Sequence, residues 1–411
     1  MDSLTINKQY IKFCAYGFLR NLRFFDAFFI LFLLAKGLNY TEIGILYAVR
    51  EITINAFEIP SGIIADTYGR KNSLMASFLL YIVSFALFYL ANEFWFFLTA
   101  FILFGIGDAF RTGTHKGIIM SYLKQKNWND QKINYYGHTR SWSQKGAAIS
   151  SLFAGLIVFY SGNYESIFLY SIIPYLLNFL LIMSYPAELN YSTKQSQNKK
   201  RIGMTAVFKS FFKNIKKPNA LRIVNISAIH SAYLRAVKDY IQPLMVNVAA
   251  MLPLMLNIDP DKKNGIIIGV LYFVIYLMTS LASKFASKAA AKSRQNISYI
   301  TLLCGLSCGI ICGVFYLYEL WIISLIAFVG IYIVENLRRP IMTGFIADNV
   351  ENEVLASVIS VESLLRTVMT AIIALAFGII ADNYGIGSAF ISLTTFLLLS
   401  SIAINNYKRK T

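Results

Sequence analysis

The stretch Gly62-Ile-Ile-Ala-Asp66-Thr-Tyr-Gly69-Arg70-Lys71 separates two long apolar segments, at about 41 to 65 and 73 to 92. Its glycines permit a tight turn and close packing, and the Asp66 carboxylate can lie against the positive end of a neighbouring helix. The basic pair that ends the stretch is typical of a cytoplasmic turn between two membrane-spanning helices. The motif therefore predicts a helical hairpin in a membrane, with its turn in the cytoplasm.

The rest of the chain repeats this alternation of apolar segment and short polar break. Of its 411 residues, 56% are hydrophobic and 14% charged, and the mean hydropathy is +0.55. A spanning helix needs about 20 mostly apolar residues, and this window fits twelve times. The fits are 10–35, 41–65, 73–92, 95–122, 138–160, 165–184, 221–249, 264–286, 297–317, 319–347, 354–380 and 386–404. We therefore expect an all-α transmembrane protein of twelve helices.

The net charge of +17 is distributed unevenly over the predicted loops. With the N-terminus in the cytoplasm, 23 basic residues fall on the cytoplasmic side, and the opposite loops hold only Lys36, Lys262 and Lys263. This is the positive-inside pattern, so the charge reports orientation and not a nucleic-acid partner. The sequence predicts a multi-pass protein of the plasma membrane with both termini in the cytoplasm and membrane lipid around it.

The longest polar stretch divides the chain into similar halves. We predict an N-terminal six-helix half at 1–184, a basic cytoplasmic linker at 185–220 and a C-terminal six-helix half at 221–411. At an offset of 227, Asp108 aligns with Glu335 and Arg111 with Arg338. Such a repeat predicts halves related by a pseudo-two-fold axis, with a solute site between them near the membrane midplane.

The loop motif at 62–71 resembles the Gly-xxx-Asp-xx-Gly-Arg-Arg/Lys signature of the major facilitator superfamily (MFS). The resemblance implies the twelve-helix MFS fold, a monomer, and transport by alternating access through a cavity lined by helices 1, 4, 7 and 10. It also implies a gating role for Gly62, Asp66, Gly69, Arg70 and Lys71 against the helix that begins near Val354. The chain departs from the family at Ser121, where many members have an acid that pairs with the motif's arginine.

Twelve basic and seven acidic residues fall inside the predicted spans. A charge at the bilayer centre costs about 2.5 to 3.5 kcal/mol on insertion scales, so most of these side chains must face a polar interior. The candidates for solute binding or coupling are Arg20, Arg23, Asp26, Asp108, Arg111, His115, Lys238, Asp239, Glu335, Arg338 and Arg339. Helical spacing places Asp108, Arg111 and His115 on one face, and Lys238-Asp239-Tyr240 marks a break in helix 7. The alternative for each cluster is an interhelical ion pair that fixes packing and never touches solute.

The surplus of cations inside the spans favours an anionic or zwitterionic small solute. The carboxylates of Asp108 and Glu335 and the imidazole of His115 could carry a coupling proton. Multidrug efflux is a second hypothesis, weakened because helix 5 lacks the glycine-proline signature of drug antiporters. A membrane-embedded lipid-modifying enzyme is a third, but the chain contains no HExxH, GxSxG or phosphate-binding GxxxxGK[ST] motif, so we assign no catalytic residues. Its three histidines have no metal-ligand spacing, so we expect neither a metal nor a cofactor.

Overall fold

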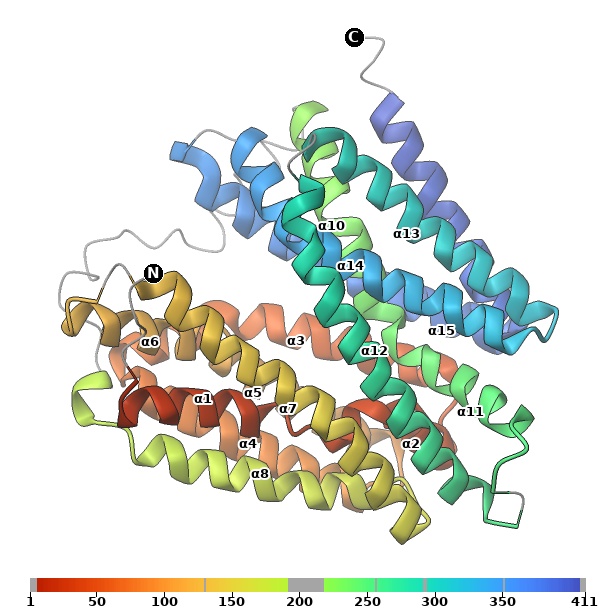
Figure 1. The fold of residues 1–411 in the computed structure, drawn as a ribbon, viewed down its shortest axis with the longest axis horizontal. Helices are drawn as coiled ribbons and strands as arrows, with labels where there is room; N and C mark the ends of the chain where they lie inside the picture. Colours follow the sequence, from red (N-terminus) through yellow and green to blue (C-terminus); the bar gives the residue numbers. More distant parts are fainter. Residues whose placement is uncertain are drawn as a thin grey trace. The chain divides into compact units, whose positions relative to one another are not determined.

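A computed structural model describes residues 6–128, 131–190, 218–255, 257–290, 294–349 and 352–406, and these form helices joined by short connections (Figure 1). Most of the predicted linker, 191–217, lies outside the described residues. The helices in chain order are α1 Lys8–Arg20, η1 Phe24–Ala27, α2 Phe29–Ala35, α3 Tyr40–Thr67, α4 Arg70–Leu90, α5 Phe94–Arg111, α6 Thr114–Gln125, α7 Lys132–Ser161, α8 Ser166–Met183, η3 Ala187–Leu189, α10 Pro218–Val237, η5 Lys238–Tyr240, α11 Ile241–Met251, α12 Pro260–Ala290, α13 Arg294–Leu317, α14 Trp321–Asn349 and α15 Asn352–Asn406.

These helices account for the twelve predicted spans. In the part of the chain that the structure describes, seven stretches are both long and apolar enough to cross a membrane by themselves. The last two predicted spans, 354–380 and 386–404, join in α15, which bends at Gly385 with φ at +83°. That left-handed backbone is accessible to glycine at little cost, so the bend is set by the residue type.

Three predicted spans are interrupted, and only one of the interruptions was expected. The span 221–249 breaks at Lys238–Tyr240, as the sequence predicted. The span 10–35 also breaks after Arg20, where the Asn21 side chain donates a hydrogen bond of 2.7 Å to the Gly17 carbonyl oxygen and ends α1. The span 95–122 breaks at Gly113, whose φ of +78° starts a new helix. Single continuous helices over 10–35 and 95–122 were therefore wrong.

The chain forms two compact units, and three helices, α2, α3 and α12, are divided between them. Unit 1 contains Met1–Phe32, Ile52–Lys200 and Asn257–Tyr276, and unit 2 contains Leu33–Glu51, Arg201–Leu256 and Leu277–Thr411. The first half of α3 thus belongs to unit 2, where it packs on α15, and the first part of α12 belongs to unit 1, where it packs on α7. Each crossing helix carries a segment from one sequence half into the unit formed mainly by the other half.

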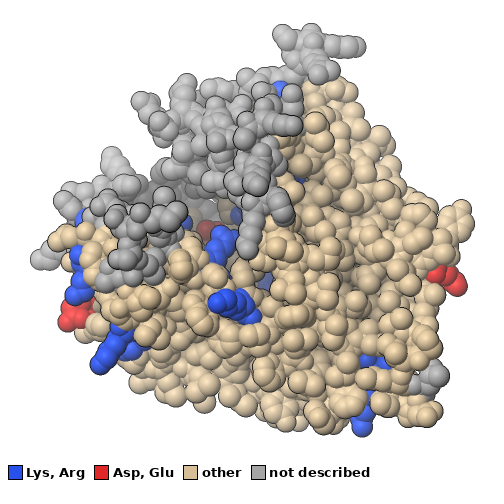
Figure 2. Space-filling model, viewed as in Figure 1, with Lys and Arg blue, Asp and Glu red and all other residues tan. Residues whose placement is uncertain are grey.

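Large apolar side chains cover much of the surface. On α8, Leu176, Leu177 and Leu180 are 47%, 50% and 51% exposed, as expected of a helix that faces lipid. Figure 2 shows that charged side chains are sparse among the residues that it colours. The interior of unit 1 is filled by packed aromatic rings, such as Phe25 stacked on Phe168 at 5.7 Å between ring centres.

Close helix packing in unit 2 depends on the glycines of α13. A Cβ at Gly313 would lie 2.7 Å from the carbonyl oxygen of Gly387 on α15, and one at Gly305 would overlap Nε2 of His230 on α10. The four-residue spacing of Gly305, Gly309 and Gly313 is typical of membrane helices that pack closely. Cys304, Cys308 and Cys312 between these glycines are free thiols.

Candidate functional site

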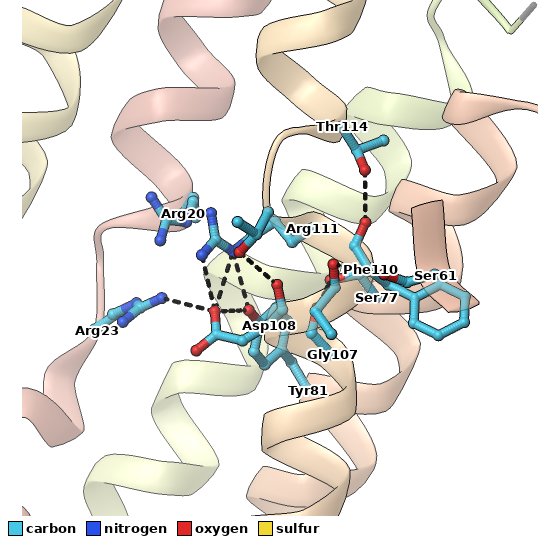
Figure 3. Close-up of polar contacts among 12 residues, drawn as sticks. Arg20, Arg23, Ser61, Ser77, Tyr81, Gly107, Asp108, Phe110, Arg111 and Thr114 are labelled. Carbon is cyan, nitrogen blue, oxygen red and sulfur yellow. Dashed lines mark hydrogen bonds and ion pairs between the residues drawn. The ribbon is translucent and has the colours of Figure 1, made fainter. Parts of the chain in front are cut away.

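In unit 1, the break after α1 and the end of α5 gather three arginines near Asp108, and two of them, Arg23 and Arg111, pair with its carboxylate (Figure 3). Arg20 is the last residue of α1, Arg23 precedes η1, and Arg111 ends α5. Asp108 lies one turn before Arg111 on α5. Because both helices end at this point, long side chains and helix-terminal backbone groups gather inside a predicted span.

The carboxylate of Asp108 is the centre of this cluster. Its Oδ1 accepts hydrogen bonds from Arg111 Nη2 at 2.8 Å and from the hydroxyl of Tyr81 on α4, and lies 4.0 Å from Arg23 Nη2. Arg111 Nε also donates to the Tyr81 hydroxyl at 3.0 Å. Only 15% of the Asp108 side chain is exposed, so the ion pairs are weakly screened by solvent. We name Arg20, Arg23, Asp108 and Arg111 the arginine cluster.

The arginine cluster has more hydrogen-bond donors than acceptors. Three buried polar atoms have no hydrogen-bond partner among the described residues: Tyr16 Oη, Arg20 Nε and Arg23 Nη2. The two guanidinium nitrogens can only donate, and the tyrosine hydroxyl can donate as well. Arg23 is otherwise held through Nε, which donates to the Tyr175 hydroxyl at 3.1 Å. An oxyanion would supply the hydrogen-bond acceptors that these donors lack.

Two other predicted residues of this half, Asp26 and His115, lie on different elements, η1 and α6. Asp26 is on η1 and interacts electrostatically with Arg23, so it shares the neutralisation of the arginines. His115 does not continue the face of Asp108 and Arg111, because the break at Gly113 moves it to α6. Its ring stacks on Tyr16 at 3.6 Å between centroids, and Nε2 lies 3.3 Å from the Tyr185 hydroxyl. His115 therefore supports the Tyr16 side of the cluster.

In unit 2, the carboxylate of Glu335 on α14 is held by two groups of α10. One oxygen lies 2.9 Å from His230 Nδ1, and the other accepts a hydrogen bond of 2.7 Å from the Ser231 hydroxyl. Arg339 Nε lies 3.4 Å away on the same helix. Glu335 and His230 are 2% and 0% exposed. This pairing could not be predicted from the sequence, since His230 lies 105 residues from Glu335 and no spacing rule connects them.

Arg338 is engaged differently from its repeat partner Arg111. Its guanidinium donates to the carbonyl oxygens of Ser298 and Ile226 and to the Thr301 hydroxyl, and only 1% of the residue is exposed. These partners connect α10, α13 and α14. In the described contacts the predicted repeat of the Asp108 and Arg111 hydrogen bonds is thus not formed. Two carbonyl oxygens and the Thr301 hydroxyl accept from the terminal nitrogens of Arg338, and its Nε has no hydrogen-bond partner among the described residues.

A further group of charges surrounds the break in helix 7. Asp239 accepts a hydrogen bond of 3.0 Å from the Tyr47 hydroxyl and lies 3.4 Å from Lys238 Nζ. Glu51, completely buried, pairs with Arg235 at 2.9 Å and with its neighbour Arg50 at 3.2 Å. Tyr47, Glu51 and Arg235 were not among the predicted site residues. Tyr47 and Glu51 lie on α3 and their partners Asp239 and Arg235 on η5 and α10, so only tertiary packing reveals these pairs.

The loop motif is fixed to its own unit by hydrogen bonds. Arg70 Nη1 donates to the Gly117 carbonyl at 3.0 Å and to the Ser121 hydroxyl at 2.9 Å, so serine accepts the bond where many relatives have an acid. Arg70 Nε also lies 3.9 Å from Asp66. Gly69 has a φ of +102°, and a Cβ there would overlap the Asn190 amide. The side chains around Val354, the expected partner of Asp66, lie outside the described residues.

The final member of the motif, Lys71, ties the same turn to the end of α8. Its Nζ donates to the carbonyl oxygens of Met183 and Tyr185, each at 2.8 Å.

Among the described residues, no group of three or more His, Cys, Asp or Glu side chains is arranged to hold a metal ion.

Comparisons with known proteins give a consistent family. The family model described as the Major Facilitator Superfamily matches residues 13–374. An uncharacterised MFS-type transporter of Bacillus subtilis, YxaM, is 34% identical over 104 residues, which is 25% of this chain and 26% of that protein. The matched region thus spans about a quarter of that relative.

Solved structures show the same fold at low sequence identity. A mutant of the nucleoside transporter NupG has a TM-score of 0.78 at 11% identity, over 96% of this chain and 99% of that one. The POT family transporter PepTSo has a TM-score of 0.74 at 13% identity, over 99% of both chains. These likenesses establish the twelve-helix fold.

Proposed function

Because the chain belongs to the major facilitator superfamily, and is therefore a multi-pass membrane transporter and not an enzyme, we propose that it moves a small anionic or zwitterionic solute by alternating access. The observation that carries the proposal is the arginine cluster. Arg23 and Arg111 face the Asp108 carboxylate, Arg20 lies close enough to interact electrostatically with both arginines, and two guanidinium nitrogens have no hydrogen-bond partner among the described residues. A carboxylate or phosphate oxygen of a solute would satisfy these donors.

Charge balance limits the solute further. Arg20, Arg23 and Arg111 carry three positive charges, and Asp108 with Asp26 carries two negative ones. The surplus of one favours a solute with a single negative group at this point, with any ammonium group placed elsewhere. A lipophilic cation would meet repulsion here, which disfavours multidrug efflux. The structural neighbours include a nucleoside transporter and a peptide transporter, whose solutes are polar, and they do not identify the solute of this chain.

Glu335 is our proposed proton-binding residue. Its carboxylate is buried, and His230, Ser231 and Arg339 surround it, so a change in protonation would rearrange a closed hydrogen-bond network. Arg338 is tied to backbone carbonyls and would position α14 without contacting solute. This assignment makes Glu335 a coupling residue and gives Arg338 a packing role.

The first test is a ligand-stabilisation screen on purified protein, with monocarboxylates, phosphate esters, amino acids, sugars and lipophilic cations. We expect an anion or zwitterion to raise the unfolding temperature of the wild type, and to lose that effect in Arg20→Gln. Arg140→Gln on α7 is the matched control, because this exposed arginine is outside the cluster. Stabilisation by lipophilic cations alone would reject the anion site and support multidrug efflux.

A positive compound then enters a flux assay in liposomes. Accumulation driven by an imposed pH gradient would support proton coupling, and accumulation that ignores the gradient would reject it. Binding without any flux would contradict the transport proposal itself.

A further inference from the structure

The loop motif has a second copy in the chain. Residues 378–385, Gly-Ile-Ile-Ala-Asp-Asn-Tyr-Gly, match residues 62–69 at seven of eight positions. The first copy ends α3, and the second lies at the bend of α15, where Gly385 has a φ of +83° as Gly69 has one of +102°. Both copies therefore place an aspartate three residues before a left-handed glycine at a helix end.

The second copy makes a contact with a specific chemistry. The two carboxylate oxygens of Asp382 accept hydrogen bonds from the backbone N–H groups of Tyr40, at 2.8 Å, and Thr41, at 2.6 Å. These are the first residues of α3. Asn39 and Glu42 exchange the other two bonds of that turn, with Glu42 N donating to Asn39 Oδ1 at 2.8 Å and Asn39 N donating to Glu42 Oε2 at 3.0 Å. The start of α3 is thus half capped by itself and half by α15.

Close backbone packing accompanies this cap. A Cβ on Gly378 would overlap the carbonyl oxygen of Tyr40, and one on Gly44 would lie 2.6 Å from the carbonyl oxygen of Ala374. In contrast, no heavy atom of the described residues lies within 4 Å of a Cβ built on Gly62, the equivalent glycine of the first copy. Among the described residues, the glycine of the second copy packs closely against a helix end, and the glycine of the first copy makes no comparably close backbone contact.

The equivalent crossing in unit 1 lacks such an acid. There α12 packs on α7 through Gly155, whose Cβ would lie 2.5 Å from the Gly265 carbonyl oxygen. The α12 helix is capped by its own Asp259, which accepts hydrogen bonds from the N–H groups of Asp261 and Lys262 at 2.9 and 3.4 Å. A cap donated across the crossing is therefore a property of α3 and α15 in the described chain, and glycine packing alone does not require it.

We propose that Asp382 is a latch that holds the Tyr40 end of α3 against α15, and that the latch opens in each transport cycle. The expected topology puts this end on the side away from the cytoplasm. The latch works because the Asp382 carboxylate stabilises the partial positive charge at the N-terminus of α3. This stabilisation is lost when α3 and α15 separate. Since α3 carries the first copy of the motif at its other end, one helix would connect the two gates.

The test measures the distance between the two helix ends without any solute, so its result is independent of the proposed substrate. Spin labels are placed at the exposed residues Ala35, at the end of α2, and Tyr384, beside the latch, after the four native cysteines are replaced by alanine. Asp382→Asn removes the charge at nearly constant shape. We expect the ratio of separated to latched molecules to rise roughly 2- to 5-fold, the change that corresponds to one exposed helix-terminal charge interaction of about 0.3 to 1 kcal/mol.

Asn383→Ala is the matched control, because the Asn383 amide bonds only to Ile379 of its own helix in the described contacts. Gly378→Ala gives an independent route, since its Cβ would push the helices apart without changing charge. The proposal is overturned if Asp382→Asn gives the same distance distribution as Asn383→Ala. It is also overturned if Asp382→Asn only lowers the unfolding temperature, because a purely structural cap would do that with no shift between the two distances.

Discussion

The arginine cluster makes Asp108→Asn an informative substitution. In the wild type, the Asp108 carboxylate neutralises Arg111 at 2.8 Å and Arg23 at 4.0 Å. Two unit charges 4 Å apart attract by about 4 kcal/mol at an effective dielectric constant of 20. Removing one partner of a buried pair costs about 3 to 5 kcal/mol, because the remaining charge stays desolvated. With the side chain 15% exposed, we take the lower value of about 3 kcal/mol.

The expected loss is measurable by thermal unfolding. For a unit of about 200 residues, 1 kcal/mol corresponds to roughly 2 to 4 °C, so Asp108→Asn should unfold roughly 6 to 12 °C below the wild type. The same variant has one more uncompensated positive charge, so an added oxyanion should stabilise it more than it stabilises the wild type. Glu58→Gln is the control, because Glu58 is an exposed acid on α3.

A double-mutant cycle identifies the interaction itself. Asp108→Asn and Arg111→Gln should each destabilise, and together they should cost clearly less than the sum, with a coupling of about 1 to 3 kcal/mol. Simple additivity would refute the ion pair as the source of the loss. An Asp108→Asn protein that unfolds within 1 °C of Glu58→Gln would refute the whole electrostatic account of the cluster.

Three further outcomes are expected. Glu335→Gln should keep solute binding and exchange but lose accumulation driven by a pH gradient, because an amide cannot take up the proton; unchanged accumulation in liposomes would exclude this residue as the coupling site. Gly305→Ala should lower the free energy of unfolding by about 1 to 3 kcal/mol, measured by thermal unfolding, since its Cβ overlaps His230. In a His230→Ala background, Gly305→Ala should cause little further destabilisation. Gly69→Ala should cost about 1 to 3 kcal/mol through its left-handed backbone and the Asn190 amide, and Asn190→Ala should relieve only the second part.

The fold was predictable because bilayer thickness and helix rise fix the length of each apolar window. Twelve windows and the loop motif at 62–71 were enough for the family, and the structure agrees. The missed features are the breaks after Arg20 and at Gly113. Both lie inside long apolar windows, and window hydropathy averages over a single asparagine or glycine. A local reading of the polar run from Arg20 to Arg23 would have been the available signal.

The site was predictable only where partners share a helix. Asp108 and Arg111 are three residues apart, and helical geometry brings them together without further information. The groups that complete the clusters come from other helices: Tyr81 for Asp108, His230 for Glu335, and Arg235 for Glu51. Repeat symmetry was a poor guide here. It aligns Arg338 with Arg111, but carbonyl oxygens exposed between α10 and α13 bind the Arg338 guanidinium.

At three places in the described chain a helix break coincides with charges inside a predicted span, and one physical cause explains these three. A charge inside a membrane helix is tolerated where polar groups surround it, and an interrupted helix supplies those groups as free N–H and C=O. Arg20 and Arg23 flank the first break, Arg111 precedes the second, and Lys238 with Asp239 forms the third. Repairing a break should therefore remove the environment that its charges require. Gly113→Ala, which disfavours the left-handed turn between α5 and α6, should weaken anion binding at Arg111 even though residue 113 contacts no charge itself.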